Sequence, residues 1–295
     1  MRVLEYTVTA DFDGKKLYTF LKAGIHASAR TVTKLRHSEN GLRINGAHAR
    51  TIDILKTGDR ITVELPEVES NIPATQFDDL DIVYEDEDIM VVNKPPFLAI
   101  HPTHNHQGDT LANEFAAYFR SKGESIPFRA VGRLDKCTSG LVILALNRHS
   151  ASVMSANYDK TYIAIVDGEY HGNGTVDRPI CRPDPGKTLR AVGENGERAV
   201  THWSAECTNG EMSVLRITLE TGRTHQIRVH FSSLGTPLAG DEMYGSKNKL
   251  IGRAALHCAK VELFHPVNGK KMSFSAPMPE DMQKLTDIIL EGAKA

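Results

Sequence analysis

Two Asn-Gly dipeptides, each lying between long stretches of alternating apolar residues, constrain the fold of this chain more than any other feature. They are Asn209-Gly210 and Asn268-Gly269. Asn-Gly favours the positive φ angles of tight hairpin turns, so each dipeptide predicts that its flanking stretches pair as antiparallel strands. Those stretches are residues 199–207 and 212–220, and residues 255–264 and 272–276. We therefore expect a largely antiparallel sheet rather than repeated βαβ units.

Helical patterns and further strands complete an α+β fold class. Short apolar runs predict strands at residues 82–84, 89–93, 141–146 and 161–166. Helices are predicted at residues 110–120 and 225–234, with a strand as the alternative for the second. The tail from Pro279 is predicted to be helical, with one apolar face made of Met282, Leu285, Ile288 and Ile289. A mainly antiparallel mixed sheet decorated by helices is expected.

The first 66 residues have a pattern of their own. Helical spacing marks residues 16–23, and Ser28 is a predicted N-cap for a second helix that reaches His37. Asn45-Gly46 marks a hairpin turn, and residues 60–65 alternate as a strand. We predict a small α/β domain over residues 1–66.

Charge separates this segment from the next one. Residues 13–65 carry ten Lys or Arg against five acids, whereas residues 66–93 carry nine acids and neither Lys nor Arg. The net charge of −2 hides this asymmetry. A basic N-terminal segment can supply phosphate contacts, although a solvated surface has the same composition. The acids, with Pro66 and Pro73, predict a linker over residues 67–80, followed by a larger domain over residues 81–292.

Several classes of protein are excluded by what the sequence lacks. The longest apolar run, at residues 141–146, is too short to cross a membrane, and the first twenty residues contain no apolar block of signal-peptide length. The four cysteines form no Cys-x-x-Cys pair, so neither a zinc ribbon nor a disulfide scaffold is expected. No Walker-type or GxGxxG loop is present, so no nucleotide cofactor is expected. We expect a cytoplasmic protein with reduced thiols and no membrane partner.

The segment VGRLDKCTSG at residues 131–140 holds one candidate catalytic group. Asp135 comes just before the predicted buried strand at residues 141–146, where a carboxylate can be fixed and yet open to a cleft. An aspartate in such a place is more often a turn or capping residue. Cys137 has no base nearby in the sequence, so we regard it as a structural or idle thiol.

The segment ETGRTHQIRVHFSSLG at residues 220–235 holds the second group of candidates. Thr224 is a predicted N-cap, and Gly235 is a predicted end of the helix. Arg223 and Arg228 are placed so that both can point at one anion.

Histidines give little support for a metal site. His225 and His230 are five apart, which is wrong for ligands on one helix face. The cluster His101, His104 and His106 has no carboxylate at ligand spacing, so no metal is expected.

Several of these segments together resemble the RluA-type pseudouridine synthases. They are GRLDKCTSG, KTYIAIVDG, and TGRTHQIRVH with GTPLAGD and YG behind it. Asn93-Lys94-Pro95-Pro96, Leu256-His257-Cys258-Ala259 and Ala276-Pro277-Met278-Pro279 match the family's other segments in the right order. The resemblance covers residues 81–285. Residues 13–65 resemble, more weakly, the αL-type RNA-binding module of a small-subunit ribosomal protein. Gly132 departs from the histidine that the family usually has before Arg-Leu-Asp.

The resemblance implies that the chain isomerises uridine in ribosomal or transfer RNA to pseudouridine, without a cofactor. Asp135 matches the family's catalytic aspartate, which either attacks the sugar or removes a sugar proton. Arg228 matches the residue that pairs with that aspartate, and a guanidinium there favours the ionised carboxylate. Tyr162 matches the tyrosine that packs on the target base. These three residues are the predicted catalytic group.

Other residues are implied in RNA recognition. Arg133 matches the residue that enters the space left by a flipped-out nucleotide. Substrate contacts are also expected from Ile227, Leu256, Arg223 and His225. Lys16, Arg30, Lys34, Arg36 and Arg43 are the predicted RNA-binding residues of the N-terminal domain. RNA is the expected partner of a monomeric protein. The alternative functions are a non-catalytic RNA-binding or ribosome-assembly factor, and a metal-dependent hydrolase that uses the histidines at 101–106.

Overall fold

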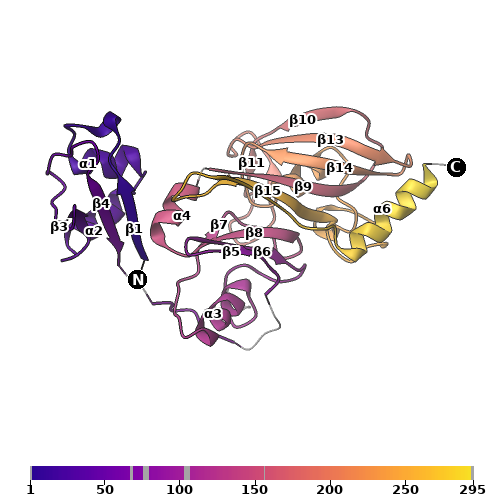
Figure 1. The fold of residues 1–295 in the computed structure, drawn as a ribbon. Coiled ribbons are helices and arrows are strands. Elements are labelled where there is room, and N and C mark those ends of the chain that lie inside the picture. Colours follow the sequence, from indigo (N-terminus) through magenta and orange to yellow (C-terminus); the bar gives the residue numbers. More distant parts are fainter. Residues whose placement is uncertain (1, 67–68, 76–79, 103–106, 156, 294–295) are drawn as a thin grey trace.

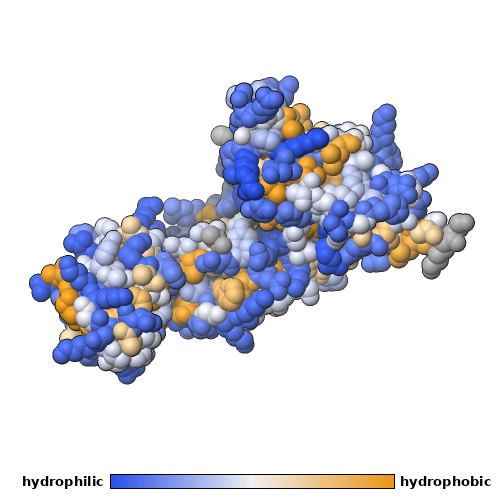
Figure 2. Space-filling model, turned by 90° about the horizontal axis from the view of Figure 1, so that it is seen from above, coloured by the Kyte–Doolittle hydropathy of each residue, from blue (hydrophilic) through white to orange (hydrophobic). Residues whose placement is uncertain are grey.

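The computed structural model describes residues 2–66, 69–75, 80–102, 107–155 and 157–293. Two β-sheets with separate hydrophobic cores organise these residues. The first sheet lies within residues 2–65, which we call the N-terminal module. The module is a separate lobe at one end of the molecule, and the C-terminal helix lies at the other end (Figure 1, Figure 2).

The N-terminal module is a four-stranded antiparallel sheet packed on short helices. Its strands run in the order β1 (Arg2–Thr7), β4 (Arg60–Leu65), β2 (Leu42–Ile44) and β3 (Ala47–His48). The helical segments are η1 (Ala10–Phe12), α1 (Leu17–Thr19), η2 (Phe20–Gly24) and α2 (Ala29–Arg36). The Ser28 side chain accepts a hydrogen bond from the backbone N–H of Thr31, so the predicted cap of α2 is confirmed. The sequence pattern did not reveal β1, because Leu4 is its one buried residue.

The larger part of the chain is built on a ten-stranded sheet. Eight strands follow the order β10-β13-β14-β9-β15-β8-β6-β5, while β16 pairs with β15 and β7 pairs with β8. The strands are β5 (Ile82–Glu85), β6 (Ile89–Lys94), β7 (Ala130–Val131), β8 (Ser139–Ala145), β9 (Tyr158–Asp167), β10 (Asn173–Asp177), β13 (Val200–Thr208), β14 (Met212–Leu219), β15 (Leu256–Phe264) and β16 (Lys271–Ser275). A separate short hairpin consists of β11 (Ile180–Cys181) and β12 (Ala191–Val192). Both hairpins predicted at Asn209-Gly210 and Asn268-Gly269 are confirmed.

Helices lie around this sheet at several positions. They are α3 (Leu111–Ser121), α4 (Arg148–Met154), α5 (Gln226–Ser233), η3 (Glu242–Tyr244) and α6 (Glu280–Gly292). None of the helices in the described ranges combines the length and apolar character needed to cross a membrane. On α6, Met282, Leu285 and Ile289 are buried, but Ile288 is 44% exposed, so its predicted place on the apolar face was wrong.

Strands β8 and β15 pair in parallel. In the described part of the chain, the other strand pairs of this sheet are antiparallel. The parallel contact positions the site described below. It joins His257 to Ser139 and Cys258 to Gly140. Gly140 has a φ of 107°, and a Cβ atom there would lie 2.3 Å from the carbonyl oxygen of Cys258. Only glycine permits this approach of two backbones. As a result, Leu256 at the start of β15 lies beside the loop that precedes β8.

We expect Gly140→Ala to lower the free energy of unfolding by about 3 kcal/mol, because it combines an unfavourable φ with a backbone clash. Gly210→Ala is the matched control, since Gly210 has a φ of 86° but a Cβ atom added there would meet nothing within 4 Å. That variant should lose about 1 kcal/mol. Urea denaturation of the two variants measures the difference. Equal losses would mean that the close contact of β8 and β15 has no energetic consequence.

Candidate active site

A cavity of about 560 Å³ opens among five segments of the larger part of the chain. Its walls come from the loop between β7 and β8, from β9, from the loop between β14 and α5, from α5 and from the start of β15. All eight residues predicted as catalytic or substrate-binding line it: Arg133, Asp135, Tyr162, Arg223, His225, Ile227, Arg228 and Leu256. Residues from distant parts of the sequence thus converge on one space.

A buried arginine between two carboxylates forms the base of the cavity. The Nη1 atom of Arg228 lies 3.3 Å from Oδ2 of Asp135. Its Nε and Nη2 atoms donate to the two carboxylate oxygens of Asp241, at 2.7 and 2.8 Å. The side chain of Asp241 is 2% exposed, whereas that of Asp135 is 23% exposed. Asp241 therefore holds the guanidinium, and Asp135 is the carboxylate that faces the cavity.

The electrostatics of Arg228 keep it charged. Burial alone would lower the pKa of its guanidinium, but the hydrogen bonds and charge of Asp241, with the charge of Asp135, raise that pKa instead. The guanidinium also lies over the ring of Tyr244, 4.9 Å from the ring centre. A permanent cation therefore lies beside the carboxylate of Asp135.

Apolar and aromatic side chains form another wall. Tyr162 on β9, Ile227 on α5 and Leu256 on β15 are all buried and line the cavity. Burial raises the pKa of the Tyr162 phenol well above its usual value, with a smaller effect from Cys258. Its hydroxyl is therefore protonated at any ordinary pH. Lys160, two residues before Tyr162, lines the same cavity, and burial lowers its pKa.

His225 is held in an unusual backbone conformation at the start of α5. Its φ of 59° is left-handed, which costs about 1–3 kcal/mol for a residue with a side chain. It is the N-cap of α5, so the prediction of Thr224 as the cap was wrong by one residue. The ring Nδ1 lies 2.8 Å from the hydroxyl of Tyr244, and Nε2 lies 3.9 Å from Asp135. Burial lowers the pKa of His225, although Asp135 opposes that shift.

Arg133 and Arg223, at the rim of the cavity, differ in how many contacts hold their side chains. Arg133 is exposed, and its Nη2 donates to the hydroxyl of Thr224 at 3.5 Å. Arg223 forms an ion pair with Glu197 and donates to the carbonyl of Arg198 at 3.1 Å. The expectation that Arg223 and Arg228 point at one anion was therefore wrong, because each is bound to a carboxylate of its own.

Gly132, just before Arg133, lies in a position that suits glycine. Its φ is 75°, and a Cβ atom at this position would lie 2.5 Å from the hydroxyl of Tyr158. The residue thus has both a backbone conformation and a neighbour that suit glycine. The side chain of Tyr158 occupies part of the cavity wall next to it.

The predicted RNA-binding residues of the N-terminal module lie outside this cavity. Arg30, Lys34 and Arg36 are on α2, Lys16 is the N-cap of α1, and Arg43 is on β2. Arg30 and Lys34, four residues apart, share one face of α2. Arg43 is partly neutralised, because its Nη2 lies 3.6 Å from Glu64.

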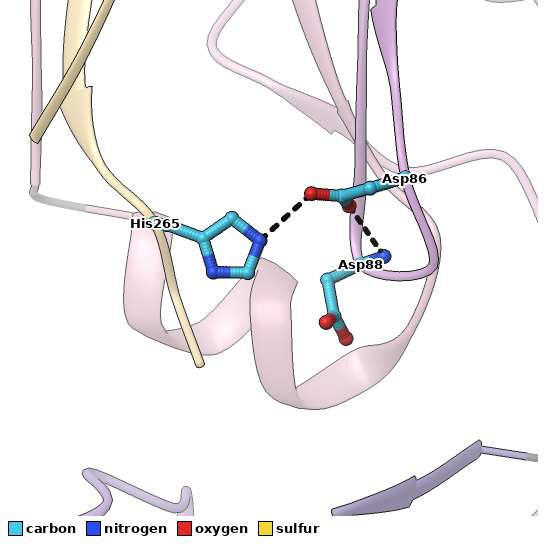
Figure 3. Close-up of side chains that lie close together, drawn as sticks. All are labelled: Asp86, Asp88 and His265. Carbon is cyan, nitrogen blue, oxygen red and sulfur yellow. Dashed lines mark hydrogen bonds and ion pairs between the residues drawn. The ribbon is translucent and has the colours of Figure 1, made fainter. Parts of the chain in front are cut away.

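A third group of side chains, Asp86, Asp88 and His265, has ligand atoms within 4.8 Å of one another (Figure 3). Protein donors already use these atoms. The carboxylate of Asp86 accepts from the backbone N–H groups of Asp88 and Ile89, from the Tyr84 hydroxyl and from His265 Nε2. Asp88 accepts from Arg2 and Asn147. The group thus serves as a hydrogen-bonded turn. Of the sequence's histidine cluster, His104 and His106 lie outside the described residues, and His101 packs edge-on against Phe128.

Sequence reasoning assigned no role to three residues of the site: Asp241, Tyr244 and Lys160. Asp241 and Tyr244 lie in the GTPLAGD and YG segments, so their place in those motifs was the one signal that could have found them. Their contacts with Arg228 depend on the turn that carries η3 back toward α5, which no local pattern specifies.

Comparisons with known proteins agree with this geometry. A family model described as RNA pseudouridylate synthase matches residues 88–233. The uncharacterized RNA pseudouridine synthase YhcT of Bacillus subtilis is 37% identical over 96% of each chain. The ribosomal large subunit pseudouridine synthase D of Pseudomonas aeruginosa is 34% identical over 86% of this chain and 85% of its own. The solved structure of human RNA pseudouridylate synthase domain containing 1 has the same fold, with a TM-score of 0.55 at 24% identity over 71% of this chain and 94% of that one.

This chain belongs to the RNA pseudouridine synthases. Within them it is of the RluA type, as the motifs around Asp135 and Arg228 had indicated. The protein is therefore an isomerase that acts on RNA, and its expected α+β fold is confirmed.

Asp241→Asn should lower kcat by about 100-fold, since a neutral side chain no longer fixes Arg228 and the guanidinium moves relative to Asp135. KM should change little, because the amide keeps the shape of the carboxylate, but the urea midpoint should fall, because the buried guanidinium loses its main charged partner. Single-turnover and steady-state assays on RNA measure this. Asp287→Asn, on the exposed face of α6, is the control. A kcat within twofold of wild type would show that Asp241 does not position the site.

Proposed function

We propose that this cavity converts uridines in the RNA of the large ribosomal subunit to pseudouridine, with Asp135 as the catalytic group. The observation that carries the proposal is the accessible carboxylate of Asp135, 3.3 Å from a buried arginine that a second aspartate holds. The choice of RNA rests on similarity to proteins named for the large ribosomal subunit. Transfer RNA is the alternative substrate.

The reaction breaks the bond between N1 of uracil and C1′ of the ribose, and joins C5 of the base to C1′. The base gains a proton at N1 and loses the proton from C5, so the reaction needs no redox cofactor. Asp135 either attacks C1′ as a nucleophile or removes the proton from C2′ as a base. Both roles require the ionised carboxylate, and the guanidinium of Arg228 lies beside it as a counter-charge.

Tyr162 supports the base while it detaches and turns. Its ring offers a flat apolar face for stacking, and Ile227 and Leu256 exclude water from the same space. Because burial raises its pKa, the phenol keeps its proton and can donate a hydrogen bond to the turning base. His225, fixed by Tyr244 and facing Asp135, and Arg223 at the rim complete the substrate contacts.

The target uridine must leave its stack before it reaches Asp135. Unstacking a nucleotide costs on the order of a few kcal/mol. Arg133 is exposed at the rim, where a planar guanidinium can stack in the vacated position and bind a phosphate together. It therefore acts in base flipping.

In this proposal the chain works as a monomer with three parts: an αL-type RNA-binding domain at 1–66, an acidic linker at 67–80 and the catalytic domain at 81–292. Salt-sensitive contacts to phosphates come from Lys16, Arg30, Lys34, Arg36 and Arg43.

All four cysteines are free thiols, which suits a reducing compartment. The site of action is therefore the cytoplasm.

Asp135→Asn should abolish pseudouridine formation and leave the affinity for RNA within a few-fold of wild type, because the amide keeps the shape but cannot attack or take a proton. Conversion is measured by chemical mapping of pseudouridine in a transcript, and affinity by filter binding. Cys137→Ser, two residues away, is the control and should retain conversion. Pseudouridine formed by Asp135→Asn would show that another group is catalytic.

Pseudouridine mapping of total RNA from cells with and without the gene identifies the substrate. We expect positions in large-subunit ribosomal RNA to lose the modification, and to regain it with the wild-type gene but not with Asp135→Asn. Loss of modification in transfer RNA alone would replace the ribosomal proposal.

A further inference from the structure

A second cavity, of about 890 Å³, lies where the N-terminal module meets the larger part of the chain. Its walls include α2 and the end of β4 on the module side, and α4 with the segment after α3 on the other side. Among the residues that the structure describes, none lines both this cavity and the catalytic one. It is a separate feature of the molecule.

Specific polar contacts fix the two sides of this joint. Arg2 of β1 donates to both carboxylate oxygens of Asp88, at 3.0 and 2.7 Å, and lies 2.8 Å from Glu87. Asn147, the N-cap of α4, donates to Asp88 at 2.8 Å. Since Asp88 is buried, these bonds define how the module sits against α4.

Cations from both sides gather in the cavity. They are Lys34 of α2, Arg148 at the start of α4, and Arg129 before β7. The nearby charge of Arg148 is the main reason that the pKa of Lys34 is lowered, and burial, followed by the charge of Arg148, lowers the pKa of Arg129. Within the described ranges, neither Lys34 nor Arg148 forms an ion pair, and Arg129 donates only to the carbonyls of Pro127 and Leu146. These like charges thus lie in one cavity with no ion-pair partner among the described residues.

The acids of the cavity do not neutralise these cations. Glu85 pairs with Lys122, and Glu87 shares Arg2 with Asp88, whereas Asp86 accepts hydrogen bonds from Tyr84, His265 and two backbone N–H groups. The remaining acids, Glu69 and Glu124, precede Ser70 and Ser125, whose backbone N–H and hydroxyl are hydrogen-bonded, and within the described ranges neither forms an ion pair with these cations. The α2 and α4 side is therefore positive.

We propose that Lys34 and Arg148, with Arg129 beside them, bind the phosphate backbone of the substrate RNA at the joint between the module and the catalytic part. A phosphate supplies the counter-charge that these cations lack among the described residues, and it accepts hydrogen bonds from ammonium and guanidinium groups. The joint then serves as an anchor for RNA outside the catalytic cavity. This inference rests on the proposed function, in which RNA binds both parts of the chain.

The salt dependence of RNA binding tests the anchor. Filter binding is measured over a range of salt concentrations with two unmodified transcripts, one of large-subunit ribosomal RNA and one of transfer RNA. The variants are then compared on the RNA that the wild-type protein modifies. Lys34→Gln and Arg148→Gln should each reduce the slope of log K against log salt by about 1, because each removes a phosphate contact. A wild-type slope in either variant would overturn the proposal.

Lys284→Gln is the matched control. Lys284 is an exposed lysine of α6, paired with Glu280 and at the far end of the molecule from the module (Figure 1). Its variant should keep the wild-type slope. Urea midpoints of all three variants exclude unfolding as a cause.

Amine acylation gives an independent measurement on the unmutated protein. RNA should protect Lys34 from acylation and leave Lys284 reactive. Unprotected Lys34 in saturating RNA would also overturn the proposal. Failure of the proposed function is distinguishable, because it would appear as a wild-type protein that forms no pseudouridine in either RNA.

Discussion

The guanidinium of Arg228 between Asp241 and Asp135 is the interaction on which the site depends. A buried cation needs charged partners, and Asp241 supplies them through both of its oxygens. The Nη1 group of the guanidinium is left for Asp135, which is the more accessible carboxylate. A single aspartate beside the arginine would have to neutralise it and perform the chemistry. With two, one holds the charge in place and the other is left for the substrate.

The sheet makes this arrangement possible by bringing two strands into an unusually close parallel contact. Gly140 on β8 faces the backbone of Cys258 on β15, so the loop that carries Asp135 lies beside Leu256. The antiparallel pair of β15 and β9 then brings Tyr162 opposite Cys258. Strand pairing thus sets the positions of the backbone segments that carry Tyr162 and Asp135.

Local patterns predicted the elements well and their contacts less well. The hairpins at Asn209-Gly210 and Asn268-Gly269, and the cap at Ser28, follow from short-range backbone chemistry, so the sequence contains their whole cause. The left-handed His225 and the exposed Ile288 depend on what packs against them. The partners of Arg228 and Arg223 come from distant segments. The resemblance to family motifs identified residues that line the cavity. It did not indicate that Asp241, rather than Asp135, is the main partner of Arg228.

The structure also explains how a chain with a net charge of −2 can bind a polyanion. Within the described part of the acidic stretch at 66–93, Glu85 and Asp88 are paired with Lys122 and Arg2, and Asp86 is hydrogen-bonded to His265. The two paired acids repel a phosphate backbone less than their charges imply, because each has a cation beside it. The cations on α2 have no such partners among the described residues. The fold therefore places acids and unpaired cations in different parts of the molecule. The net charge is a poor guide to the partner of such a protein, because it does not show this separation.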